Sequence, residues 1–152
     1  MKQILNLLFL FIFNLAVIAQ PAFDSGKFFT DESLLNVTIS TDIKNLLSGK
    51  IKNDAQKASF TCLLPDSSAL TEVIELTVRG KMRRKVCDVP PLRLDFKTSS
   101  SPRLKSLGRL KLVNACSDNS TRDQWLLKEY LIYKIYNLIS EKSFKVRLLN
   151  IT

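Results

Sequence analysis

The stretch VIELTVRGKMRRKVCDVPPLRLDF, residues 73–96, contains two strand patterns joined by a strongly basic connection. Residues 73–79 are rich in β-branched side chains, which fit a pleated strand, and residues 92–96 alternate apolar and polar side chains. No helix pattern separates the two. Successive strands of this kind favour a sheet that is mostly antiparallel.

Further strand and helix patterns flank this stretch on both sides. A short helix, capped by Thr41 or Asp42, is expected to end at Leu47, and a long helix is expected to begin near residues 118–121 and reach residue 139. Runs of strands with only two helices indicate an α+β fold, with a mostly antiparallel sheet, one short helix and one long helix. The other expected strands cover residues 35–40, 58–64, 107–113 and 144–151.

The long helix carries more apolar residues than a surface helix needs. Leu127, Leu131, Ile135 and Leu138 follow the spacing of one face, and further apolar residues widen this stripe around the helix. We therefore expect the helix to be covered on two sides.

The N-terminus has the features of a targeting segment. Lys2 precedes an apolar run at residues 4–18, and small residues, ending in Ala19, suit a signal-peptidase site. The run is too short for a membrane span of about 20 residues. We therefore divide the chain into a signal peptide at 1–19, a flexible lead-in at 20–33 and a single α+β domain at 34–152. This predicts a secreted, periplasmic or cell-surface protein without a membrane anchor after cleavage.

The chain stops at Thr152, one residue after a strand pattern. A complete small domain and a truncated part of a larger protein are both consistent with this, and truncation would leave part of the long helix without its cover. We take the domain as incomplete at its C-terminus.

The charge of the chain is concentrated in one segment. Residues 79–111 hold eleven basic residues against only Asp88 and Asp95, so their net charge of +9 equals that of the whole chain. Such a concentration predicts one positive surface that attracts anions or phosphate. The simpler interpretation is a basic surface that is only solvated and binds no ligand. Few aromatic residues accompany it, which argues against nucleic acid. The predicted ligand-binding residues are Arg79, Lys81, Arg83, Arg84 and Arg93. The first three are spaced two residues apart, so on a strand their side chains would share one face.

Two of the three cysteines are expected to pair in an oxidising compartment. Cys87 and Cys116 lie in loops that flank the basic strands, whereas Cys62 lies within a strand pattern and is expected to be a buried thiol. The spacing of the three does not match a zinc site.

The composition excludes several kinds of catalysis. The chain has no histidine, which removes His-dependent nucleophile systems, and its four glycines form no phosphate-binding loop. The acidic residues form no obvious catalytic pair. We therefore predict no catalytic residue and no metal site.

Lys111 and Glu129 suggest one further chemistry. Lys111 lies on a predicted strand that leads into the long helix, and Glu129 lies about two turns into that helix. A strand lysine paired with a helix glutamate positions ATP phosphates in kinases. The alternative is an ordinary surface lysine and an exposed glutamate.

Several segments together resemble a group of secreted Bacteroidetes-type proteins that are distantly similar to the N-terminal part of the spore-coat CotH family of kinase-like proteins. The resemblance rests on VRGKMRR (78–84), CDVPPLRLDF (87–96), LKLV (110–113), WLLKEYLIYKIYN (125–137) and SFKVRL (143–148). It implies the N-terminal portion of an atypical kinase, with Lys111 and Glu129 as nucleotide-positioning residues. ATP and magnesium would then serve as cofactors of a full-length form, because the metal-binding acidic residues would lie beyond Thr152.

Three interpretations of function remain. The first is an exported CotH-like kinase portion that lacks a complete active site. The second is a non-catalytic, disulfide-braced module that binds anionic ligands through a basic sheet face. The third is a gene fragment without stable function that exposes its apolar helix.

Overall fold

The computed structural model describes residues 25–52, 54–63, 69–116 and 120–152. The predicted signal peptide at 1–19 and the first part of the predicted lead-in lie outside these residues. None of the helices in the described part of the chain has the length and apolar content needed to cross a membrane.

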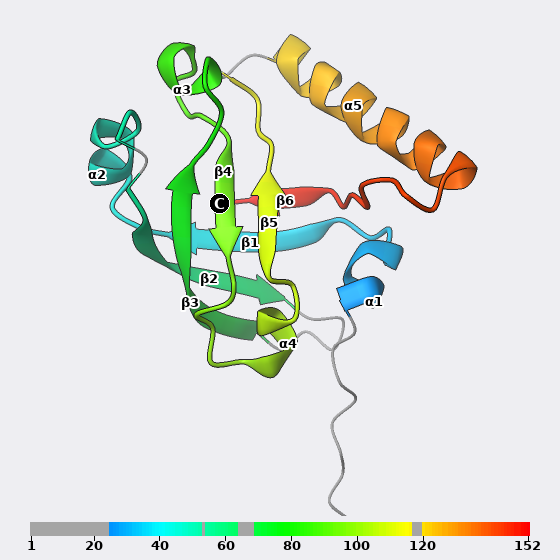
Figure 1. Ribbon diagram of the computed structural model, residues 1–152, viewed down its shortest axis with the longest axis horizontal. Coiled ribbons are helices and arrows are strands. Elements are labelled where there is room, and N and C mark those ends of the chain that lie inside the picture. The colour runs from blue at the N-terminus through cyan, green and yellow to red at the C-terminus, as the bar shows by residue number, and fades with distance from the viewer. Residues whose placement is uncertain (1–24, 53, 64–68, 117–119) are drawn as a thin grey trace, which may run out of the picture.

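A six-stranded sheet forms the body of the protein, in the order β5-β4-β3-β2-β1-β6 (Figure 1). All neighbouring strands pair antiparallel except β1 and β6, which are parallel. Together with one long helix, this sheet confirms the α+β fold and the mostly antiparallel pairing. The strands are β1 (Leu35–Ser40), β2 (Gln56–Leu63), β3 (Ala69–Val78), β4 (Leu92–Asp95), β5 (Arg109–Leu112) and β6 (Leu149–Ile151).

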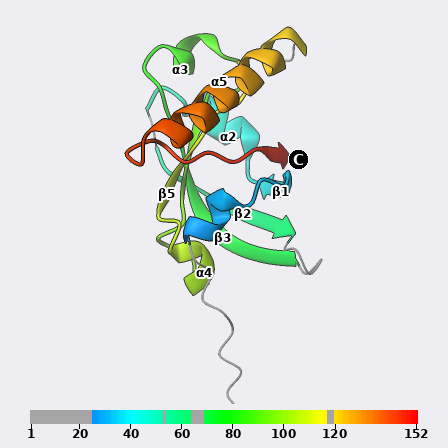
Figure 2. The same cartoon turned by 90° about the vertical axis from the view of Figure 1, so that its right-hand side faces the viewer.

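The sheet is curled, as the side view shows (Figure 2). The apolar core of the described residues lies against it. Alternation along β3 and β4 places Ile74, Leu76 and Leu94 on the inner face of the sheet, where each is at most 2% exposed. The rings of Phe60 and Phe96 meet edge to face at 5.0 Å in this core. Cys62 is a buried free thiol, as the strand pattern predicted.

The N-terminal helix α1 (Ser25–Thr30) corrects the prediction of a flexible lead-in at 20–33 for the part that is described. Phe28 is only 7% exposed and belongs to the core. Arg147 holds this segment in place, because it donates to the Phe28 carbonyl at 3.0 Å and to the Asp31 carboxylate at 2.7 Å. These contacts span more than a hundred residues of sequence, so no local pattern could reveal them.

Three further short helices connect the strands. Helix α2 (Ile43–Ser48) was predicted, and its N-cap Asp42 accepts a hydrogen bond from the Asn45 amide at 2.9 Å. Helix α4 (Pro102–Lys105) lies between β4 and β5 and was not predicted. Helix α3 (Arg83–Val86) replaces the predicted strand continuation through residue 83. β3 ends at Val78, and Gly80 turns the chain with φ of 90°, which side chains other than glycine disfavour.

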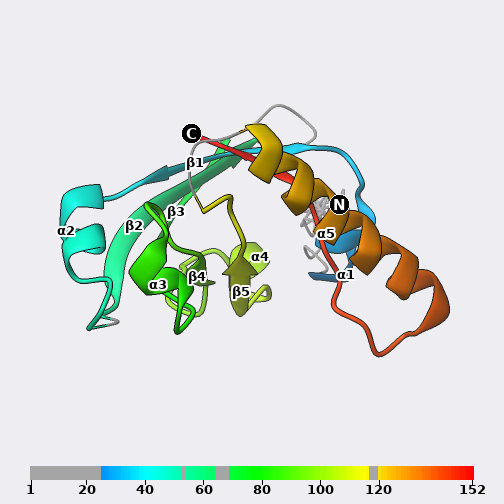
Figure 3. The same cartoon turned by 90° about the horizontal axis from the view of Figure 1, so that it is seen from above.

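The long helix α5 (Ser120–Ile139) stands beside the sheet and apart from α3, β4 and β5 when seen from above (Figure 3). The prediction that it is covered on two sides is wrong within the described chain. Its apolar side faces solvent along a stripe that we call the α5 arc. The residues of this arc are each between 56% and 89% exposed. The α5 arc consists of Trp125, Leu131, Ile132, Ile135, Leu138 and Ile139.

The opposite side of α5 faces the body of the protein and is more polar. Asn137 donates to the Phe144 carbonyl at 2.8 Å, and Lys134 pairs with Glu32 at 2.5 Å. The Tyr133 ring meets the Phe144 ring edge to face at 6.2 Å. After this turn the chain returns to the sheet, where β6 confirms a terminal strand, although it is shorter than the predicted 144–151.

Candidate anion-binding site

Three basic residues on the outer face of the sheet form no ion pair among the described residues. Arg93 in β4 lies directly opposite Lys111 in β5, and the main-chain amide of Arg79 donates to the Pro91 carbonyl at 2.8 Å, which extends the β3–β4 pairing. Because side chains two residues apart share a face, Arg79 continues the outer row that contains Thr77, the cross-strand partner of Arg93. We call Arg79, Arg93 and Lys111 the basic face.

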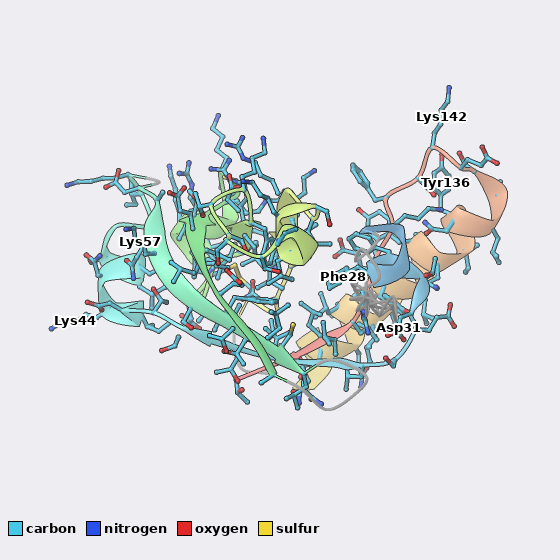
Figure 4. All side chains as sticks on the ribbon, turned by 90° about the horizontal axis from the view of Figure 1, so that it is seen from below. Phe28, Asp31, Lys44, Lys57, Tyr136 and Lys142 are labelled. Atoms are coloured by element: carbon cyan, nitrogen blue, oxygen red, sulfur yellow. A yellow bond between two sulfur atoms is a disulfide. The ribbon has the colours of Figure 1, made fainter. Side chains whose placement is uncertain are left out.

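The connection between β3 and β4 adds a second group of cations, which we call the α3 turn: Lys81, Arg83, Arg84 and Lys85. The prediction that Arg79, Lys81 and Arg83 share one strand face is wrong, because the chain leaves the sheet at Gly80. Figure 4 shows nitrogen-tipped side chains crowded on the side of the sheet where α3, β4, β5 and α4 lie. The turn therefore supplies its charges from beyond the end of the sheet.

Main-chain carbonyls hold the two arginines of the α3 turn. Arg83 donates to the Asn114 carbonyl at 2.8 Å, and Arg84 donates to the Gly80 carbonyl at 2.8 Å. A carbonyl orients a guanidinium group without neutralising its charge. Both arginines are thus partly ordered while they keep a full positive charge for a ligand.

Only one ion pair neutralises this region in the described part of the chain. The Arg109 guanidinium lies 2.5 Å from the Asp95 carboxylate, on the outer face next to the basic face. Burial of Asp95 opposes ionisation, but hydrogen bonds from Arg109 and from the Lys97 amide outweigh it, so the pKa of Asp95 lies below its usual value. Within the described ranges, the cations of the basic face and the α3 turn have no carboxylate partner.

Two side chains of the basic face have unusual surroundings. The Arg93 guanidinium donates to the Thr77 hydroxyl at 3.3 Å, and its Nε atom is buried with no hydrogen-bond partner among the described residues. The Lys111 ammonium lies 4.7 Å from the centre of the Phe144 ring, which is itself 66% exposed. Phe144 is a site residue that sequence reasoning missed, because its distance of more than thirty residues from Lys111 hides the contact.

A disulfide joins Cys87 and Cys116, as predicted. It ties the end of the α3 turn to the segment that follows β5, and the Asp88 amide adds a hydrogen bond to the Cys116 carbonyl at 3.1 Å. Closing a loop with this separation of 29 residues stabilises the fold by about 3–4 kcal/mol on the chain-entropy account. The bond therefore fixes the α3 turn against the sheet.

Lys111 and Glu129 do not form the ion pair that the kinase hypothesis expects. None of the ion pairs among the described residues joins them, and Lys111 contacts Phe144 instead. Glu129 lines an open hollow of about 350 Å³ between α5 and the disulfide, together with Arg83, Asn114 and Trp125. The structure thus brings Glu129 near a predicted anion-binding arginine rather than to Lys111.

Asn114 is another residue that the sequence did not single out. Its amide nitrogen donates to the Val89 and Ala115 carbonyls at 2.8 and 3.0 Å, which fixes the orientation of the side chain. Its side-chain oxygen is buried and has no partner in the part of the chain that the structure describes. Within the described ranges, no three acidic or cysteine side chains gather as metal ligands.

Comparisons with known proteins give no relative. No family model matches the chain, and neither a curated protein nor a solved structure is significantly similar to it.

Proposed function

We propose that this protein is a non-catalytic, disulfide-braced module that binds a polyanion outside the cytoplasm, through the basic face and the α3 turn. The observation that supports it is the lack of neutralisation: seven cations lie at one end of the sheet, and the neighbouring Asp95 is already paired with Arg109. A disulfide and the absence of a membrane-spanning helix among the described residues are compatible with a soluble extracytoplasmic protein.

The spacing of the cations favours an extended ligand over a single small anion. They lie on two neighbouring strands, at the end of a third and on the turn beyond it, so they cannot all converge on one point. A polymer with repeated sulfate, phosphate or carboxylate groups could contact several of them at once. Arginine suits such oxygens, since its planar fork donates two parallel hydrogen bonds.

A charge-matched comparison tests this proposal, with dextran sulfate as the probe. The triple variant Arg79→Gln, Arg93→Gln and Lys111→Gln removes the basic face. The control variant Lys44→Gln, Lys57→Gln and Lys142→Gln removes the same charge from exposed lysines that Figure 4 labels outside the crowded group. Three exposed contacts of about 0.5 kcal/mol each predict a loss of affinity of about tenfold in the first variant.

The control should lose much less affinity, because its lysines act only through the net charge. Raising the salt concentration should weaken binding by the wild type and the control more than by the triple variant. Equal losses in the two variants would contradict a localised site, and binding that salt does not weaken would contradict an electrostatic one.

A second candidate is the N-terminal portion of a CotH-like kinase. One observation favours it: the strand that carries Lys111 leads directly into the long helix, and Glu129 on that helix lines the hollow beside the disulfide. A full-length form would then use Lys111 and Glu129 to position ATP with magnesium.

Glu129→Gln separates the two candidates. In a full-length form, ATP with magnesium should raise the melting temperature if Lys111 and Glu129 position a nucleotide, and both Lys111→Ala and Glu129→Gln should abolish that rise. For a polyanion site, Glu129→Gln removes a nearby negative charge, so dextran sulfate should bind equally well or more tightly. If ATP with magnesium leaves the melting temperature of the full-length form unchanged, the kinase candidate is rejected.

A further inference from the structure

A surface helix normally turns its apolar side toward the protein, but α5 turns its apolar side toward solvent. Residues on its inner side, such as Tyr130, Lys134 and Asn137, are partly shielded by the body, whereas the α5 arc is exposed. At 3.6 residues per turn the arc covers about 140° of the helix circumference, the width that normally faces a core. Tyr136, labelled in Figure 4 on the part of α5 far from the sheet, borders the arc and is also exposed.

We infer that the α5 arc is the interface of a homodimer, in which α5 of one copy packs against α5 of a second. The area of the arc supports this. Six large side chains with exposed fractions of 56–89% present on the order of 800 Å² of apolar surface, at roughly 200 Å² for each side chain. The largest apolar patch of an ordinary monomer is only about 300–600 Å².

A second copy is an occupant of the right size. A two-fold contact would bury the same patch on both copies, or about 1,600 Å² in total, which is the usual size of a specific interface. The single charged residue within the arc is Lys128, whose ammonium group lies 4.8 Å from the centre of the Trp125 ring. The six side chains of the arc are apolar, with Gln124 and Lys128 as the polar residues between them, so two copies of the arc can pack against one another.

The charges around the arc argue against an anionic lipid surface. A helix that lies on such a membrane carries lysine and arginine along its polar side. On α5, Glu129 lies beside one margin of the arc, and Lys134 beside the other is already paired with Glu32. A partner surface that is mainly apolar, as the arc of a second copy is, matches these margins better than an anionic surface does.

Trp125 offers a direct test, because it is the only tryptophan in the chain and belongs to the arc. Residues 20–152, which contain the whole described fold, should form dimers at high concentration in sedimentation equilibrium. Dilution should then shift the Trp125 emission to longer wavelength as the ring returns to water. Salt should strengthen the dimer, because it screens the repulsion between two chains that each carry a net charge of +8, the +9 of the whole chain less Lys2.

Leu131→Glu with Ile135→Glu should give a monomer at every concentration, with a long-wavelength emission that dilution does not change. The single variant Leu138→Glu, at an 89% exposed position, should weaken the dimer without any cost to folding. Circular dichroism of each variant establishes that it is folded. The matched control is Val73→Glu with Met82→Glu, which places the same charges at exposed apolar positions outside α5 and should leave the dimer intact.

A wild-type chain that stays monomeric at concentrations of about 100 μM would overturn the inference, since an apolar interface of this area should be occupied there. Dimers that persist in the folded double glutamate variant would also overturn it. So would a monomeric wild type that binds neutral lipid vesicles through the arc, because the occupant would then be lipid.

Discussion

The basic face and the α5 arc are both left unsatisfied by the fold, but in opposite ways. On the basic face and the α3 turn, positive charges have no carboxylate partner in the part of the chain that the structure describes, and main-chain carbonyls hold two of the arginines. On α5, the protein leaves apolar side chains in water and turns the polar side of the helix inward. Among the described residues, the basic face and the α3 turn lack counter-charges, and the α5 arc lacks side chains packed against it.

This difference separates the two surfaces experimentally. Contacts between exposed charges weaken as salt screens them, whereas apolar contacts between two positively charged chains strengthen. Substitutions in one surface should therefore leave the binding property of the other unchanged, and that unchanged property shows that the variant is still folded.

The disulfide should have the largest effect, and it should act on one surface more than on the other. Replacing Cys87 and Cys116 by serine should lower the free energy of unfolding by about 3–4 kcal/mol, measured by urea denaturation. The folded variant should also bind dextran sulfate more weakly, because the α3 turn loses its link to the segment after β5. Dimerisation through α5 should persist. A folded variant that loses the dimer but keeps its polyanion affinity would contradict the assignment of polyanion binding to the α3 turn and of dimerisation to α5.

Two leucines compare the core with the α5 arc. Leu76 is fully buried in β3, so Leu76→Ala should cost about 3 kcal/mol of stability through the cavity it leaves. Leu131 is 56% exposed, so Leu131→Ala should change monomer stability by less than about 0.5 kcal/mol while it weakens the dimer. Chemical denaturation at a concentration that favours the monomer measures both. Similar losses for the two leucines would mean that α5 is packed within the monomer.

Asp95 should affect stability and binding in opposite directions. Asp95→Asn removes a carboxylate that accepts hydrogen bonds from Arg109 and the Lys97 amide, at a cost of about 2 kcal/mol near neutral pH. The same change should raise the affinity for dextran sulfate, since it leaves the Arg109 charge unpaired. A variant that binds the polyanion less tightly would argue against a site governed by charge.

The pH dependence of this variant follows from the lowered pKa of Asp95. An aspartate with a lowered pKa in the folded state stabilises the protein above its ordinary value of about 3.9, and that contribution is lost as the pH falls through the folded-state value. The stability difference between wild type and Asp95→Asn should therefore be constant near neutral pH and shrink below about pH 4. A difference that does not change with pH would contradict this account of the ion pair.

Lys134 should have the smallest effect. Its partner Glu32 is 70% exposed, and such pairs contribute only about 0.2–1 kcal/mol. Lys134→Gln should lower the thermal midpoint slightly and leave both dimerisation and polyanion binding unchanged. A loss of the dimer would show that the inner side of α5, rather than the arc, carries the interface.

Local patterns were sufficient for most of the sheet. Alternation correctly predicted β1 and β4, the β-branched run predicted most of β3, and the cysteines in flanking loops predicted the disulfide. These features depend on side chains close together in sequence, or on a chemistry open to few residues. The same patterns misplaced Arg83, because alternating basic residues imitate a strand and Gly80 was not recognised as the point where the chain turns.

The parts that were missed depend on distant contacts. Arg147 anchors Phe28 across the fold, and Phe144 meets Lys111 only because the chain returns after α5. For α5 itself, periodicity predicted the helix but not which side would face the body. Asn137 and Lys134 bind the turn and the N-terminal segment, and this directs the apolar side outward.

The most direct test of the opposition between the two surfaces is one salt series on the wild-type chain, with dextran sulfate affinity and the monomer–dimer equilibrium measured in each buffer. We predict that rising salt weakens polyanion binding and strengthens the dimer. If both respond to salt in the same direction, or if neither responds, the division into a charged and an apolar surface is wrong.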